Sequence, residues 1–192
     1  MHSFTTARLL IRPFIQEDEE PYCQLYADEK VMRNCGGVFT LAQAKKNFGN
    51  ALKAIQRKKK TVLNWAIIER SSNQFIGFQA LSWQKPTQTP KPSIDNINQV
   101  EIGIMLISKA NGKQYPEEAM GALMEYAFNY QNVDRINAFY ANKNLATKRF
   151  LKKLQFNFDP NLQDNTTDNS YQYFDKKQWQ NSVIILLYEY SL

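Results

Sequence analysis

The stretch SKANGKQY, residues 108–115, combines the residue types of an anion-binding loop. It links an apolar, strand-like segment to a helix-like one, and the N-terminus of a helix exposes unpaired N–H groups and a partial positive charge. Lys109 and Lys113 place a cation on either side of Gly112. The stretch matches neither the phosphate-binding pattern GxxxxGK[ST] nor the dinucleotide pattern GxGxxG. It indicates a diphosphate site, although ordinary surface loops also carry one glycine and two lysines before a helix.

Histidine and cysteine are too scarce for several other kinds of site. His2 is the only histidine, and Cys23 and Cys35, the only cysteines, form no CxxC pair. Nucleophilic catalysis by a Ser-His-Asp or Cys-His arrangement is therefore excluded, as are imidazole metal clusters. A zinc site or a disulfide framework finds no support either, and we expect no metal.

Length and composition favour one globular domain. With 192 residues, of which 43% are apolar and 13% aromatic, the chain can bury a core, and we expect a single domain over residues 1–192. The net charge of +6 favours polyanionic partners, such as phosphorylated cofactors, RNA-rich assemblies or acidic surfaces. There is no signal-peptide pattern and no run of about 20 apolar residues, so we expect a cytoplasmic protein that does not enter a membrane.

Two periodicities predict the elements that must position the loop. Segments rich in β-branched and aromatic residues predict strands at 8–13, 61–69, 75–83, 99–108, 135–141 and 183–190, the second and third as an antiparallel hairpin. Apolar residues three and four apart predict helices at 17–27, 40–59, 116–130 and 144–154, with Thr40 as an N-cap. Strands alternate with helices in the second half, which argues for an α/β fold with at least one parallel strand pair.

Two segments show no clear periodicity. Residues 85–98 contain Pro86, Pro90 and Pro92 and predict a loop that is long for a compact domain, either bordering a ligand site or disordered. Residues 159–179 are polar and then aromatic, and they could cover a sheet edge or a partner.

The segments TARLLIRPF, NWAIIE, FIGFQAL, VEIGIML, KANGKQYPEEAMGALMEYAF and NKNLATKRFLKKLQF follow one another in this order. Together they resemble the GNAT superfamily of acetyl-CoA-dependent N-acetyltransferases, in register from about Thr6 to Phe158. The resemblance is greatest to the branch that includes the ribosomal-protein N-terminal alanine and serine acetyltransferases. It implies an α/β (α+β) fold with a mixed, mostly antiparallel central sheet of about seven strands, splayed at the cofactor cleft and flanked by about four helices.

The resemblance also implies that main-chain amides of the loop hold the coenzyme A pyrophosphate. The family's loop motif is Gln or Arg, two residues, Gly, one residue, then Gly or Ala, and it falls here on Lys109, Gly112 and Gln114. Lys109 keeps the positive charge. At Gln114 the family has a small residue, which lets the main chain come close to the phosphates, and the longer glutamine side chain hinders this close approach. Pro116 lacks an N–H where the family usually has Ala. The implied cofactor contacts in this loop come from Lys109, Asn111, Gly112, Lys113, Gln114 and Tyr115.

Further contacts are implied at the end of the preceding strand. Family members splay two parallel strands there, and the exposed main chain of Met105, Leu106 and Ile107 pairs with the pantetheine arm. A strand N–H near the thioester can stabilise the oxyanion. Asn144 matches the family's Asn, whose amide bonds the pantetheine, and Thr147 stands where many relatives have a Ser near the sulfur. The two residues could equally form an ordinary helix start with Asn144 as N-cap, and the two interpretations can coexist.

Acetylation of an amine requires a base, because an ammonium must lose a proton before its nitrogen attacks a thioester. Glu101 is our candidate, since it is the one carboxylate within VEIGIML. Strand alternation places it on the face of Gly103 and Met105. Burial on that face would raise its pKa toward the working range, whereas a position at the rim would not. Thr147, a tyrosine such as Tyr140 or a chain of waters could protonate the leaving thiolate.

We therefore expect direct transfer of an acetyl group from acetyl-CoA to a primary amine, with no covalent enzyme intermediate. The first acceptor candidate is the α-amino group of a protein or peptide, of the ribosomal-protein type, with a possible association with a ribosome or RNA-rich assembly. A small amine or an antibiotic is the second candidate. A non-catalytic acyl-CoA-binding or nucleic-acid-associated module with a degenerate pyrophosphate loop is the alternative from another class. We expect a monomer or a homodimer.

Overall fold

The computed structural model describes residues 1–57, 61–83, 97–163 and 166–179. The strands are β1 (Phe4–Thr5), β2 (Leu9–Pro13), β3 (Val62–Glu69), β4 (Gln74–Ser82), β5 (Gln99–Leu106), β6 (Arg135–Ala141) and β7 (Asn169–Asp175). The α-helices are α1 (Glu19–Ala27), α2 (Glu29–Met32), α3 (Leu41–Ile55), α4 (Tyr115–Tyr130), α5 (Leu145–Lys153) and α6 (Lys176–Trp179). Short 3-10 helices are η1 (Gln16–Asp18), η2 (Ser108–Ala110) and η3 (Pro160–Leu162).

The strands form one sheet in sequence order, from β1 to β7. Neighbouring strands run antiparallel except for β5 and β6, which are parallel. This confirms the expected mixed, mostly antiparallel sheet of seven strands. The described part of the chain has six α-helices instead of about four, because α2 and α6, of four residues each, are too short to produce a periodic pattern.

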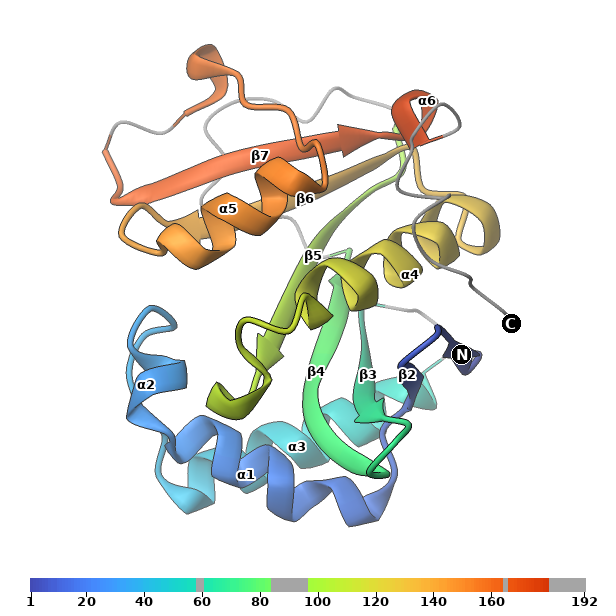
Figure 1. Cartoon of the computed structure of the whole chain (residues 1–192), viewed down its shortest axis with the longest axis vertical. Helices are drawn as coiled ribbons and strands as arrows, with labels where there is room; N and C mark the ends of the chain where they lie inside the picture. The colour runs from blue at the N-terminus through green and yellow to red at the C-terminus, as the bar shows by residue number, and fades with distance from the viewer. Residues whose placement is uncertain (58–60, 84–96, 164–165, 180–192) are drawn as a thin grey trace.

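Helices cover both faces of the sheet. On one face α1 and α3 bury side chains such as Leu25 and Phe48 against β3 and β4. On the other face α4 and α5 bury Leu123 and Leu151 against strands from β1 to β6. In Figure 1, α1 and α3 lie together at the lower end of the view, and α4 and α5 lie higher, over the second half of the sheet. The fold is therefore a three-layer α/β/α arrangement, and no helix in the described ranges has the length and apolar character of a membrane span.

Strands β5 and β6 separate soon after they begin. Three register pairs join them, and the last is Glu101 with Asn137, although β5 continues to Leu106 and β6 to Ala141. Strand β4 stays paired with β5 as far as Leu106. Figure 1 shows β5 and β6 starting side by side at the upper right and pointing apart toward the left. The predicted splay is therefore present, and no strand within the described residues pairs with the edge of β5 that faces β6 after Glu101.

The last described strand was not predicted. Strand β7 lies within residues 159–179, for which we expected a cover over an edge or a partner, and it pairs with β6 along its whole length. Its buried positions are Gln172 and Phe174, and partly exposed tyrosines alternate with them. An amide among the buried positions weakens the apolar alternation that would have indicated a strand. The strand predicted at 183–190 lies outside the described residues, as does nearly all of the loop predicted at 85–98.

Capping groups support the predicted helix starts. The Thr40 Oγ1 accepts the Gln43 N–H at 3.3 Å, and the Gln43 Oε1 accepts the Thr40 N–H at 2.8 Å. This reciprocal capping box begins α3 one residue after Thr40. The acidic stretch near residue 18 first forms η1 and then α1, because Asp18 turns back to pair with Arg12 of β2 at 2.6 Å.

Candidate active site

Glu101 lies at the last register pair before β5 and β6 diverge. Its half-buried side chain shares a face of β5 with Gly103 and Met105, and Met105 packs against the core under α1 and α3. Burial raises the pKa of Glu101 above its ordinary value. This carboxyl can therefore accept a proton at a pH closer to neutrality than an exposed glutamate can. Of the two positions considered for Glu101, buried or at the rim, the structure shows the buried one.

Amide and aromatic side chains lie on the same sheet face as Glu101. Asn137, its register partner, donates from Nδ2 to the Gln99 Oε1 at 3.1 Å and accepts the Tyr171 hydroxyl at 2.8 Å. Tyr171 packs against Phe139, with ring centroids 5.0 Å apart. Burial raises the pKa of Tyr171, so its hydroxyl remains a donor. We call Gln99, Asn137, Phe139 and Tyr171 the amide–aromatic row. Its members come from three strands, β5, β6 and β7, so no local sequence pattern could predict that they lie together.

The loop after β5 has a backbone suited to an anion site. Gly112 has a φ of +77°, and Gln114 has φ +60° and ψ +19°, so both residues adopt left-handed conformations. A Cβ on Gly112 would meet no atom within 4 Å, so glycine is required there for its φ and not for space. Gln114 holds a conformation that costs a residue with a side chain about 1–2 kcal/mol. Residues 111–114 are exposed and lie directly before α4, a helix of 16 residues.

Cations neutralise the acidic first turn of α4. Glu117 pairs with Lys153 of α5 at 3.0 Å, and Glu118 pairs with Arg8 at 2.5 Å. Pro116 lies within the first two positions of the helix, where an N–H would have no helical acceptor. The missing N–H of Pro116 therefore removes no hydrogen bond from the helix. The positive end of the α4 dipole stays available to an anion.

Asn144 and Thr147 form the expected helix start. Asn144 is the N-cap of α5, and its Oδ1 accepts the Thr147 N–H at 3.2 Å. Because the cap uses the side-chain oxygen of one residue and the main chain of the other, it occupies neither the Asn144 Nδ2 nor the Thr147 hydroxyl. Tyr140, the other candidate proton donor, is buried, and its hydroxyl accepts the Gln172 Nε2 at 2.7 Å. Thr147 is partly exposed whereas Tyr140 is buried, and each hydroxyl keeps a proton that it can donate.

In the part of the chain that the structure describes, the segment from Met105 to Ile107 bonds a neighbouring strand on one edge only, that of β4. The Ile107 N–H bonds the Ile76 carbonyl at 2.9 Å. A Cβ on Gly77 of β4 would lie 2.7 Å from the Leu106 Cδ2 and 2.9 Å from the Leu106 Cα, so only glycine allows this approach of β4 to β5. The opposite edge of this segment faces the diverging β6.

These residues lie on two sides of the diverging strands. Glu101 is on the sheet face that α1 and α3 cover, whereas Asn144 and Thr147 belong to α5, on the face of α4. The loop lies at the end of β5, ahead of α4. A molecule held between β5 and β6 would thus have a candidate base on one side and a candidate proton donor on the other.

A family model described as an acetyltransferase (GNAT) domain matches residues 8–157. The chain belongs to the GNAT acetyltransferase family. It is 31% identical over 155 residues to YnaD of Bacillus subtilis (strain 168), named an uncharacterized N-acetyltransferase, and the match covers 80% of this chain and 81% of that protein. The GNAT assignment makes the protein an acyltransferase.

Solved GNAT structures share the fold. A GNAT-family acetyltransferase from Bacillus anthracis has a TM-score of 0.73 at 22% identity, covering 92% of this chain and 99% of that one. The spermidine N-acetyltransferase of Vibrio cholerae, solved with CoA and spermine, has a TM-score of 0.72 at 13% identity, covering 91% of this chain and 99% of that one.

Acetyl-CoA is the co-substrate of GNAT acetyltransferases, and the described residues fit it. The edge of β5 that pairs with no described strand beyond Glu101 suits the amide-containing pantetheine arm, and the left-handed loop at Gly112 and Gln114 suits a pyrophosphate. Gly103 adds room, since a Cβ on it would meet nothing within 4 Å.

Proposed function

We propose that this GNAT protein transfers the acetyl group of acetyl-CoA directly to a primary amine, with Glu101 accepting the proton of the amine. The observation that carries the proposal is the position of Glu101, half-buried with a raised pKa at the point where β5 and β6 diverge. A carboxylate with a pKa nearer neutrality is a more effective general base at physiological pH.

The other predicted residues take binding and proton-donating roles in this proposal. Acetyl-CoA supplies the activated acetyl group. The free edge of β5 at Met105 to Ile107 and the Asn144 Nδ2 hold its pantetheine arm, and the exposed amides of residues 111–114 hold its pyrophosphate. The Thr147 hydroxyl donates a proton to the thiolate that leaves.

For the acceptor we propose the α-amino group of a protein or peptide, with a ribosomal protein as the first candidate and the cytoplasm as the location. The amide–aromatic row supports a peptide, because its amide and phenol groups are the types that bond peptide N–H and C=O groups. A small amine is the second candidate. Phe139 and Tyr171 favour it, since aromatic rings on the same sheet face as a carboxylate also attract an ammonium, and a structurally similar protein is a spermidine N-acetyltransferase.

An acceptor panel tests this proposal. The protein is incubated with acetyl-CoA and either peptides with N-terminal Ala, Ser or Met, the same peptides already N-acetylated, or spermidine, and thiol release is followed. We expect release with free peptides and none with the blocked ones, which differ only in the reacting amine. Faster turnover of spermidine than of any peptide would show that the acceptor is a small amine and not a peptide. Tight binding of CoA without turnover of any amine would show that the protein is a non-catalytic acyl-CoA-binding module and not an enzyme.

A further inference from the structure

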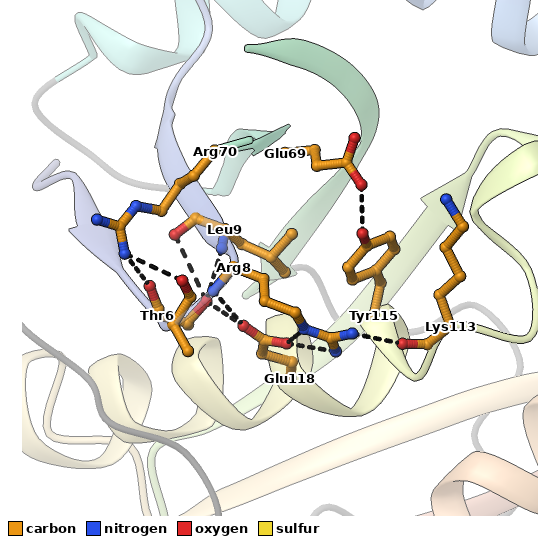
Figure 2. A network of polar contacts seen from close by, with 9 residues as sticks. Thr6, Arg8, Leu9, Glu69, Arg70, Lys113, Tyr115 and Glu118 are labelled. Atoms are coloured by element: carbon orange, nitrogen blue, oxygen red, sulfur yellow. Dashed lines mark hydrogen bonds and ion pairs between the residues drawn. The ribbon is translucent and has the colours of Figure 1, made fainter. Parts of the chain in front are cut away.

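Arg8 reaches the loop before α4 from the other end of the chain. It lies in the turn between β1 and β2, and its Nη1 donates to the Lys113 carbonyl at 2.9 Å. Its Nε donates to the Glu118 Oε2 at 2.6 Å, and its main-chain N–H donates to the Glu118 Oε1 at 3.0 Å. The Thr6 hydroxyl also donates to Glu118. Figure 2 shows these bonds converging on Arg8 and Glu118, so one guanidinium joins the N-terminal turn, the first turn of α4 and the loop.

The bond to Lys113 sets the direction of the next amide. Lys113 lies between Gly112 and Gln114, the two left-handed residues of the loop. No peptide bond in the described residues is cis, and in a trans peptide unit the C=O and the following N–H point in opposite directions. The Lys113 carbonyl points toward Arg8, and the Gln114 N–H must therefore point away from Arg8.

Neighbouring contacts hold both partners of this bond in place. Arg70 braces the turn that carries Arg8, because its Nη1 donates to the carbonyls of Thr6 and Ala7 at 2.8 and 3.1 Å. The Tyr115 ring lies under the Arg8 guanidinium, 4.6 Å from its Cζ, and its hydroxyl bonds Glu69. Figure 2 shows this ring between the side chains of Arg8 and Lys113. The loop is thus fixed on both sides of Gln114.

Charge gives the same residue a second role. Glu118 is 1% exposed in the first turn of α4, next to the proposed pyrophosphate site, where an unpaired carboxylate would repel an anion. Arg8 neutralises this carboxylate through Nε and Nη2 while its Nη1 holds the loop, a division of tasks that suits the fixed fork of a guanidinium better than the single nitrogen of an ammonium.

We infer that Arg8 is a positioning residue for acetyl-CoA, which ties Glu118 to the Lys113 carbonyl and so preorganises the Gln114 amide for the pyrophosphate. The inference rests on the proposed function, because it takes the loop to be the pyrophosphate site. Preorganisation favours binding because the loop is already ordered in the free protein, so that less conformational entropy is lost when the cofactor binds.

Arg12 provides a matched control for the test. It lies on the adjoining strand and also bonds a buried carboxylate, with Nη1 and Nη2 at 2.6 and 2.9 Å from Asp18, and a carbonyl, that of Pro13 at 3.2 Å. None of these partners belongs to the loop. We expect Arg8→Lys and Arg12→Lys to lower the urea midpoint similarly, but only Arg8→Lys to raise the calorimetric Kd for CoA and the KM for acetyl-CoA, each about ten-fold, which corresponds to about one lost hydrogen bond. The kcat should stay within about two-fold, since the acetyl end is not moved.

A second variant removes the guanidinium without stranding a buried charge. Arg8→Met combined with Glu118→Gln keeps this region neutral and should weaken CoA binding to the same extent. Unchanged CoA affinity in both Arg8 variants, or an equal loss in Arg12→Lys, would overturn the inference while leaving the proposed function intact. A wild-type protein that binds no CoA would overturn both.

Discussion

Replacing Glu101 by Gln tests the proposed base, because the amide keeps the size of the side chain and cannot accept a proton. General base catalysis contributes about 10²–10⁴-fold to a rate, so we expect kcat/KM for the amine to fall at least about a hundred-fold, or about 2.7 kcal/mol in transition-state free energy. The KM for acetyl-CoA should stay within about two-fold, since Glu101 lies outside the loop that holds the cofactor.

The pH dependence gives this variant a second readout. In the wild-type protein, activity should rise with pH through the raised pKa of Glu101, in addition to the rise caused by deprotonation of the acceptor amine. The variant should lose the first limb and keep the second. Thiol release across the pH range measures both, with the exposed Glu17→Gln as a control that should behave like the wild type. A loss below about three-fold with an unchanged pH profile would refute Glu101 as the base.

Stability should respond in the opposite direction. Because burial raises the Glu101 pKa, the folded state holds this proton more tightly than the unfolded state. The contribution is therefore fully present below the unfolded pKa and is lost as pH rises through the folded pKa. Glu101→Gln should have a higher urea midpoint than the wild type at pH 7, and the difference should vanish near pH 4, where both side chains are neutral. A variant that is less stable than the wild type at pH 7 would contradict this account.

Five other substitutions, at four positions, separate structural from functional roles. Gln114→Gly should raise the free energy of unfolding by about 0.5–1 kcal/mol in urea titrations, because relief of the left-handed strain exceeds the added chain entropy; a stability loss would contradict the strain. Gly77→Ala should cost about 3 kcal/mol or more by the same assay, because its Cβ would press on Leu106, whereas Gly103→Ala has open space and should leave stability unchanged. Asn144→Asp should retain the cap of α5 and its thermal midpoint but raise the KM for acetyl-CoA, since it lacks the side-chain N–H. Asn144→Ala should also lose about 1 kcal/mol of stability, and an unchanged KM in both Asn144 variants would exclude the pantetheine contact.

The parts of the fold that sequence predicted are those with a strong local period. The stripe through Phe48 identifies α3, and the hairpin of β3 and β4 follows from two β-rich runs around a turn. Strand β7 was missed because it buries Gln172, which has a partner only once β6 supplies Tyr140. The four-residue helices α2 and α6 are shorter than any period that a pattern can reveal.

Only those site residues could be predicted that belong to a local motif or to a segment that resembles the family. The loop and Glu101 stand in recognisable stretches, but the splay beside Glu101 depends on strand register, which the resemblance alone implied. The bond from Arg8 to Glu118 spans 110 positions, and nothing near either residue indicates the other. The left-handed φ of Gln114 is likewise a product of tertiary contacts, since glutamine does not favour it.

A crystal structure of this chain with acetyl-CoA bound tests the central claim most directly. We predict that the pantetheine arm lies between β5 and β6, that the pyrophosphate accepts bonds from the amides of residues 112–114, and that the Glu101 and Thr147 side chains flank the thioester. A cofactor bound away from the diverging strands, or a thioester out of reach of the Glu101 carboxylate even through a single water, would contradict the account.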